Sequence, residues 1–163
     1  RVGTRTHQRS IGSKSTLKDL EKWVNTLIET NDWGVGMTHG LTYGYDAFRN
    51  PQRLWDHLDQ VKARENEIWV GTFREVASYI KEREETKLEV VNKKNTLLIT
   101  PELKLDQELF VEPLTMVITG KEIKKVTVKQ GKRRLPVQIT DDKVLFDFDP
   151  YGGMIKVTLK IQK

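Results

Sequence analysis

Cysteine is absent from this chain of 163 residues, which excludes disulfide bonds and thiolate-bound metal and leaves the redox compartment open. Long apolar runs are missing too, since the longest reach about five residues and a membrane-spanning helix needs about 20. The second half has no tryptophan, because the last of the four tryptophans is Trp69. Hydrophobic residues make up 37% of the chain and charged residues 31%, which predicts a soluble, folded protein.

The net charge of +5 belongs entirely to the second half of the chain. Residues 1–86 carry 13 Lys or Arg and 13 Asp or Glu, whereas residues 87–163 carry 15 and 10. Charge and tryptophan content therefore change at the same point. This change predicts two domains, residues 1–86 and residues 87–163.

Strand and helix patterns alternate along the first half. Helical spacing of apolar residues predicts helices over Thr16–Thr30, Pro51–Arg64 and Phe73–Glu84. Asn50 would cap the second of these, whose inner face would be Leu54, Trp55, Leu58 and Val61. Short apolar runs predict strands at Val2–Thr6, Trp33–Thr38 and Glu67–Gly71. The alternation is typical of an α/β fold with a parallel sheet or a (β/α) barrel.

The second half is rich in short β-type segments separated by turn residues. Candidate strands are Leu88–Val91, Thr96–Thr100, Leu109–Val111, Met116–Thr119, Val126–Lys129, Val137–Ile139, Val144–Phe148 and Ile155–Ile161. Several of them alternate apolar and polar residues, as expected for strands with one buried face. This pattern predicts a small antiparallel β-sandwich of about seven strands.

Three strand–helix units leave the first half incomplete as a barrel, which usually takes about eight strands. A parallel sheet also needs cover on both faces. The chain begins with Arg1, and no signal-like apolar segment follows. We therefore expect it to be processed, truncated or part of a longer product. Either an upstream segment or a second copy of the chain, as in a homodimer, would cover the open sheet edge.

His39 ends the apolar run Trp33–Thr38 and is followed by Gly40. In a strand–loop–helix unit of a parallel sheet, the residue after the strand faces the ligand site. An imidazole there is suited to donate or accept a proton near neutral pH. His39 is thus a candidate general acid. The alternative is a structural residue that bonds to the backbone at the end of the strand.

Three segments together resemble the carboxyl-terminal third of the polysaccharide deacetylases, carbohydrate esterase family 4. They are Trp33–Gly40, Leu54–Asp59 and Ile68–Ile80, and the likeness covers roughly residues 1–85. The resemblance implies the last part of a distorted (β/α) barrel. The segment after residue 86 resembles, more weakly, a β-sandwich appended in some bacterial members.

The resemblance implies metal-dependent hydrolysis of an acetyl group on a polysaccharide or amino sugar. It gives His39 the role of general acid and places Met37 in the pocket for the acetyl methyl group. The family holds a divalent metal, zinc or similar, with one Asp and two His in upstream motifs that this chain lacks. The chain alone would then ligate no metal and be inactive. The family carboxylate that tunes the histidine is not identifiable here, and an extracytoplasmic location, periplasmic or secreted, is implied.

Other polar and aromatic residues are weaker candidates for a functional role. Tyr43 and Tyr45 follow His39 on a glycine-flanked loop and would either stack on sugar rings or lie on the surface. His57, among charged neighbours on the second helix, is expected to be solvated. His7 is expected in a polar loop after the first strand. The three histidines lack the spacing of a zinc site.

A basic run in the second half raises two further functions. It comprises Lys124, Lys125, Lys129, Lys132, Arg133 and Arg134. Such a run binds nucleic acid or an anionic glycan, or is simply solvated, and no aromatic residues interleave with it. We expect a solvated face and no nucleic-acid partner. A non-enzymatic carbohydrate-binding or assembly module, with the sandwich as the binding part, is the main alternative to the hydrolase.

Overall fold

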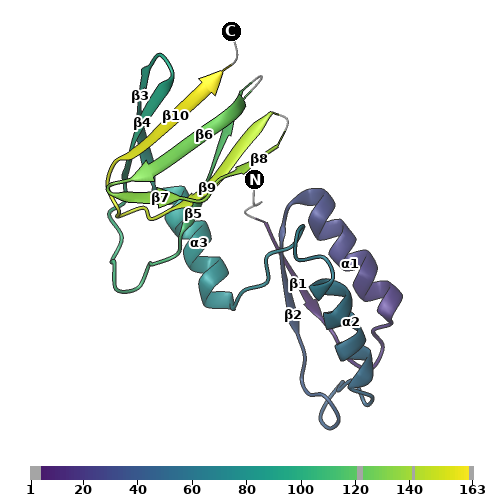
Figure 1. The fold of residues 1–163 in the computed structure, drawn as a ribbon. Coiled ribbons are helices and arrows are strands. Elements are labelled where there is room, and N and C mark those ends of the chain that lie inside the picture. Colours follow the sequence, from purple (N-terminus) through teal and green to yellow (C-terminus); the bar gives the residue numbers. More distant parts are fainter. Residues whose placement is uncertain (1–4, 121–122, 141, 162–163) are drawn as a thin grey trace. The chain divides into compact units, whose positions relative to one another are not determined.

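The computed structural model describes residues 5–120, 123–140 and 142–161, which divide into two compact units, Arg1–Phe73 and Arg74–Lys163. The first contains β1 (Thr6–Ser10), α1 (Leu17–Thr30), β2 (Trp33–Met37) and α2 (Gln52–Lys62). The second contains α3 (Phe73–Glu85, whose first residue belongs to the first unit), β3 (Lys87–Lys93), β4 (Thr96–Glu102), β5 (Leu114–Thr119), β6 (Ile123–Gln130), β7 (Arg133–Leu135), β8 (Gln138–Ile139), β9 (Lys143–Phe148) and β10 (Ile155–Ile161) (Figure 1). No helix in these described residues is long and apolar enough to cross a membrane.

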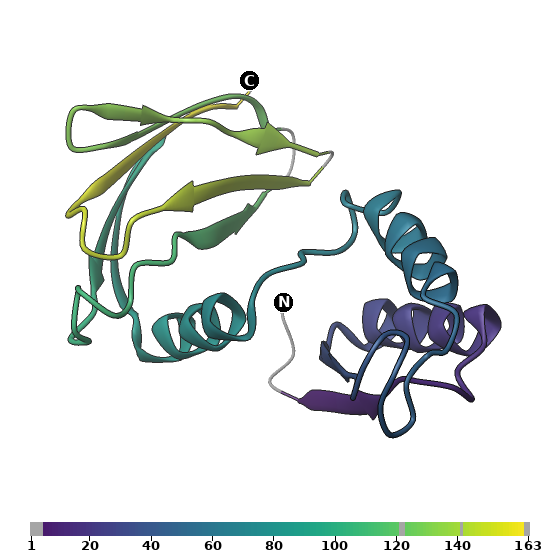
Figure 2. The ribbon, with the colours of Figure 1, turned by 90° about the horizontal axis from the view of Figure 1, so that it is seen from below.

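The first unit is a mixed α/β region built on two parallel strands. β1 pairs with β2 in the register Thr6↔Trp33 to Ser10↔Met37, and α1 connects them (Figure 2). Thr16 caps α1, because its hydroxyl accepts from the Asp19 backbone N–H and the Asp19 carboxylate accepts in return from the Thr16 backbone N–H. The predicted strand Val2–Thr6 falls mostly outside the described residues, and the observed strand begins at Thr6.

Glycine in β2 lets α1 pack directly on the sheet. A Cβ atom at Gly34 would lie 2.2 Å from Cδ1 of Leu27 and 3.1 Å from Trp23, both on α1. A side chain at Gly34 would therefore collide with the end of Leu27 and require that side chain to move. The opposite face of β2 carries Trp33, Val35 and Met37.

The predicted strand at Glu67–Gly71 is wrong. The backbone N–H groups of Glu67 and Ile68 both donate to the carbonyl of Arg64, at 2.9 and 3.0 Å, and so continue the end of α2 as turns. The residues that follow are irregular, and Trp69 and Val70 are 51% and 69% exposed. A strand needs a ladder partner, and this segment makes turn hydrogen bonds instead.

The predicted inner face of α2 is out of phase with the observed one. Trp55 and Leu58 are 44% and 45% exposed, whereas His57 is only 5% exposed. The expectation that His57 is solvated is therefore wrong. The face that turns inward carries His57, with Leu54 packed against the core cluster of this unit. The cap residue differs by one from the prediction: it is Pro51, and Asn50 just before it accepts from the Gln52 backbone N–H at 3.0 Å.

The second unit is β-rich and consists of two antiparallel sheets. One sheet has the strand order β3-β4-β10-β6-β7, and the other has β5-β9-β8. Their inner faces share one hydrophobic core of Ile99, Leu114, Val126, Val128, Leu135, Val144, Phe146, Phe148, Ile155 and Val157. Within the described residues the strands form these two sheets and no closed barrel. The antiparallel arrangement agrees with the expected second half.

Two features of the second unit differ from the expectation. Leu109–Val111 is not a strand, since the N–H groups of Leu109 and Phe110 both bond to the Asp106 carbonyl and close a turn. The helix α3 packs with the β-rich unit through Tyr79, which contacts its core. A boundary at residue 86 would separate that helix from the sheets against which it packs.

Candidate active site

Two loops meet where β1 and β2 end. The Ile11 backbone N–H donates to the Met37 carbonyl at 2.8 Å, which carries the strand pairing one residue beyond β1. Beyond that point the Asp46 carboxylate accepts from the Ser13 hydroxyl at 2.6 Å and from the Ser13 N–H at 3.2 Å. The loop after β2 is thus tied to the loop after β1 at the sheet edge where α/β proteins place their ligand sites.

Glycine is required at two points where these loops touch. A Cβ atom at Gly12 would lie 2.0 Å from the Asp46 carbonyl oxygen. At Gly40 it would lie 2.2 Å from the Tyr43 carbonyl oxygen. Backbone atoms cannot yield at such distances, so both positions exclude every other residue type. The glycine that directly follows His39 therefore shapes the loop that presents it.

His39 lies in this loop two residues after β2, with an exposed side chain. Its ring meets that of Tyr45 edge to face, with centroids 5.5 Å apart and planes inclined at 79°. The ring is therefore accessible to a ligand and held on one side by an aromatic neighbour. Exposure of this kind is compatible with proton transfer to a bound molecule.

Asp46 is a carboxylate in the same loop as His39 that the sequence analysis did not single out. The hydrogen bond from the Ser13 side chain lowers the pKa of Asp46, and the Ser13 backbone, Lys14 and His39 add to this against the opposing effect of burial. Asp46 is consequently ionised at neutral pH, within electrostatic reach of His39. The sequence held no signal for this pairing, because the Ser13–Asp46 contact joins residues on different loops.

The other candidates lie close to His39 along the chain. Met37, the last residue of β2, is 40% exposed. Tyr43 and Tyr45 are 84% and 83% exposed at the loop tip. Ala47 and Phe48 behind the tip are buried, at 0% and 1%. The loop is thus anchored at its base and presents aromatic surface at its end.

Arg53 is a second residue that the sequence did not reveal. From α2 its guanidinium donates to the carbonyls of Ser13 and Ser15, at 3.0 and 2.9 Å. It holds the loop after β1 in the position from which Ser13 binds Asp46. Nothing in its sequence neighbourhood distinguishes it from other helix-surface arginines.

His7 and His57 are placed away from this loop pair. His7 lies in β1 rather than in the expected loop, and its Nε2 is 2.8 Å from the Asp32 carboxylate. Hydrogen bonds from Thr30 and His7 lower the pKa of Asp32 against the effect of burial. His57 is buried on α2, where its Nδ1 has no hydrogen-bond partner and burial lowers its pKa. Both histidines act as parts of the packed structure.

No cluster of three His, Cys, Asp or Glu residues suited to a metal occurs in the part of the chain that the structure describes. The residues here therefore do not fit the metal centre that the family resemblance implies. His39 and Asp46 offer one imidazole and one carboxylate, and that carboxylate is already bonded to Ser13.

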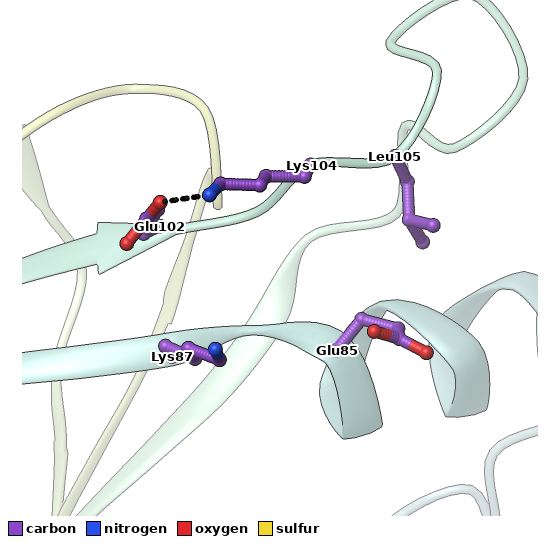
Figure 3. Close-up of a pocket in the computed structure, with 5 residues that line it drawn as sticks. All are labelled: Glu85, Lys87, Glu102, Lys104 and Leu105. Atoms are coloured by element: carbon purple, nitrogen blue, oxygen red, sulfur yellow. Dashed lines mark ion pairs between the residues drawn. The ribbon is translucent and has the colours of Figure 1, made fainter.

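Two hollows occur in the second unit. The smaller, about 120 Å³, is lined by Leu105 and four charged residues, Glu85, Lys87, Glu102 and Lys104 (Figure 3). Glu102 and Lys104 form an ion pair there at 3.1 Å, so the charges largely neutralise one another. The larger is a groove of about 680 Å³ beside β7 and β9. Its Gln130 amide is already engaged with the backbone of Asp149.

Comparison with known proteins found no family model that matches the chain and no curated protein similar to it.

Proposed function

We propose that this chain supplies the proton-donating histidine and part of the sugar-binding surface of a carbohydrate deacetylase. The observation that carries the proposal is an exposed imidazole, His39, at the carboxyl end of a parallel strand, with the anchored carboxylate of Asp46 in the same loop. The resemblance of Trp33–Gly40 and Ile68–Ile80 to the polysaccharide deacetylases selects acetyl hydrolysis among the reactions that such a histidine serves.

In this reaction water adds to the acetyl carbonyl and the bond from that carbon to the sugar nitrogen or oxygen then breaks. The leaving atom needs a proton, and His39 in its protonated form would donate it. A general acid in this position contributes roughly 10²–10⁴ in rate. In the family a metal activates the water; because the described residues do not fit that centre, the proposal places it outside this chain.

Asp46 would act through His39 rather than on the sugar. Its negative charge attracts a protonated imidazole, and its bonds to Ser13 hold the loop in place. Met37 would contact the acetyl methyl group, and Tyr43 and Tyr45 would lie along the sugar rings, since aromatic faces suit their C–H surface.

The test is a steady-state assay of acetate release by the full-length gene product, with acetylated chito-oligosaccharide and acetylated xylan as substrates. His39→Ala should lower kcat by roughly 10²–10⁴ with little change in KM or thermal stability. Asp46→Asn should alter the alkaline limb of the pH–rate profile, where the proton donor loses its proton, more than it alters KM.

Thr42→Ala is the matched control, because Thr42 is exposed on the same loop and has no assigned role. It should retain kcat. Near-normal turnover by His39→Ala would remove His39 from the mechanism, and turnover by these 163 residues alone would contradict a metal centre outside the chain.

A non-enzymatic glycan-binding module is the second candidate, favoured by the exposure of Tyr43 and Tyr45 at 84% and 83%. Solvent-exposed aromatic rings on an anchored loop are suited to sugar contact without catalysis. This candidate predicts that Tyr43→Ala and Tyr45→Ala weaken sugar binding in titrations of the chain, while no form of the gene product releases acetate.

A further inference from the structure

The outer face of the five-stranded sheet carries a row of cations across its central strands. Lys156 on β10 is the register partner of Lys129 on β6, and Lys129 is in turn the partner of Arg134 on β7. All three side chains are exposed, while the alternate residues Val128, Leu135 and Val157 point into the core. We call Lys129, Arg134 and Lys156 the cation row (Figure 1 shows its three strands side by side).

Side chains in direct cross-strand register lie about 5 Å apart, and like charges at that distance destabilise a sheet. No ion pair within the described part of the chain involves a member of the cation row. The strands β6, β7 and β10 contain no Asp or Glu at all. The three cations therefore form a strip of positive charge across β7, β6 and β10 that no ion pair within the described residues neutralises.

A row of hydroxyl groups lies beside the cation row. Thr158 on β10 pairs with Thr96 on β4 and with Thr127 on β6, and all three are half-buried on the same outer face. Lys125, exposed on β6, flanks this row on its other side. On β6 and β10 one row of hydroxyl groups thus lies between the cation row and Lys125.

We propose that this face binds an acidic polysaccharide, a polymer of sugars that carry carboxylates. Ammonium and guanidinium groups pair with the carboxylates, and the threonine hydroxyls exchange hydrogen bonds with sugar hydroxyls. The choice of a glycan over a nucleic acid rests on the proposed function and on the residues of the face. Sheets that bind single-stranded nucleic acid stack its bases on aromatic side chains, and β6, β7 and β10 contain no aromatic residue.

The test is isothermal titration of this chain with a de-esterified polygalacturonate oligomer at low ionic strength, which requires no turnover. Binding is expected, and raising the salt from about 0.05 to 0.5 M should weaken it strongly because the contacts are exposed ion pairs. The triple variant Lys129→Gln, Arg134→Gln, Lys156→Gln should weaken binding by about tenfold or more.

A second triple variant removes the same charge elsewhere in the unit: Lys81→Gln, Lys104→Gln, Lys143→Gln. These lysines lie on α3, after β4 and on β9, away from the cation row. Their loss should change the affinity less than about twofold, since screened charges act only over short range. The cation-row variant should also melt at the same or a higher temperature than the unaltered chain, because cross-strand repulsion is relieved.

Four results would overturn the proposal. They are no binding to polygalacturonate at low salt, equal loss in both triple variants, equal binding to a neutral chito-oligosaccharide, and preferential binding of a single-stranded DNA oligonucleotide or phosphatidylglycerol vesicles. Polygalacturonate lacks acetyl groups, so its binding is independent of His39. Normal acetate release by His39→Ala would refute only the proposed function. A failure of the unaltered chain to bind polygalacturonate would refute only this inference.

Discussion

The two units of this chain differ in how they are held together. In the second unit, buried residues from both sheets form one continuous apolar cluster that includes Val128, Phe146 and Ile155. In the first unit the comparable cluster consists of Ile11, Leu20 and Phe48, with Leu54 packed against it. Polar contacts also hold the loops of this unit together, such as the hydrogen bonds from Ser13 to Asp46. The unit with the candidate active site is thus the one with less apolar burial.

The open face of the first unit explains this contrast. A parallel pair needs cover on both faces, and α1 covers only the face that carries Gly34. Trp69, Val70 and Phe73 are 51%, 69% and 64% exposed in the same unit. In the second unit the two antiparallel sheets, with Tyr79 of α3, enclose a shared core, although Leu88 and Val90 on β3 remain 44% and 55% exposed. The candidate site is therefore held by local contacts between its loops, such as those of Ser13 with Asp46, rather than by a large core.

The largest expected effect tests whether the two cores are independent. Phe146→Ala should destabilise the second unit by about 3–5 kcal/mol, since it removes a buried aromatic ring from the shared core. Phe48→Ala should do the same to the first unit alone, because the ring is 1% exposed there.

The measurement uses the uneven distribution of tryptophan. All four tryptophans belong to the first unit, so tryptophan fluorescence during urea unfolding reports that unit, and amide NMR signals of the β-strands report the other. A parallel loss of both signals in either variant would show a single cooperative structure instead.

Glu82 supplies the next effect and gives the second unit its own pH dependence. The side chain is fully buried on α3; one carboxylate oxygen accepts from the Glu112 N–H at 3.0 Å and the other has no partner. Burial raises the pKa of Glu82, and the charges of Glu112 and Asp149 raise it further, against the effect of that hydrogen bond. The folded state therefore holds a proton that the unfolded state releases above pH 4.5 or so, the ordinary value. Stability should fall as the pH rises through this range.

Glu82→Gln should remove this dependence and stabilise the second unit at pH 7 by about 1–3 kcal/mol, because no buried charge remains. Thermal unfolding followed by NMR between pH 4 and 8 measures both. Glu84→Gln is the control, since Glu84 is exposed on the same helix. A second unit that loses stability on acidification across that range would contradict the assignment.

The sequence allowed the local elements of the fold to be predicted better than their contacts. The helix α1 and the strand β9 appear where the patterns placed them, because helical spacing and face alternation are properties of a few adjacent residues. The segment Glu67–Gly71 has a strand-like composition, yet its first amides bond to Arg64 and no ladder forms. A strand depends on a partner elsewhere in the chain, which composition does not reveal.

The candidate site shows the same limit. His39 was identifiable because its position follows from the strand that precedes it and the glycine that follows. Asp46 and Arg53 were not, since their roles arise from contacts with Ser13 on a different loop. His57 was misjudged because its charged sequence neighbours suggested a solvated position, whereas the residue is only 5% exposed. The burial of His57 depends on which face of α2 packs inward. A wrong choice of that face makes a buried residue look exposed.

The smallest effect concerns that histidine and gives the first unit the opposite pH dependence. His57 is 5% exposed, and burial lowers its pKa below the ordinary 6.5. The folded state keeps the ring neutral while the unfolded state takes up a proton below that pH, so the first unit should lose stability as the pH falls from about 7 to 5.

His57→Leu should remove this loss and add about 1 kcal/mol to the stability of the first unit, because the unpartnered Nδ1 is gone. Tryptophan fluorescence during unfolding at pH 5 and 7 measures it, with Gln60→Leu on the exposed side of α2 as control. An unchanged loss of stability between pH 7 and 5 in His57→Leu would show that His57 is not its source. The carboxylates of Asp19, Asp32 and Asp46 would contribute only at lower pH, because their pKa values are lowered.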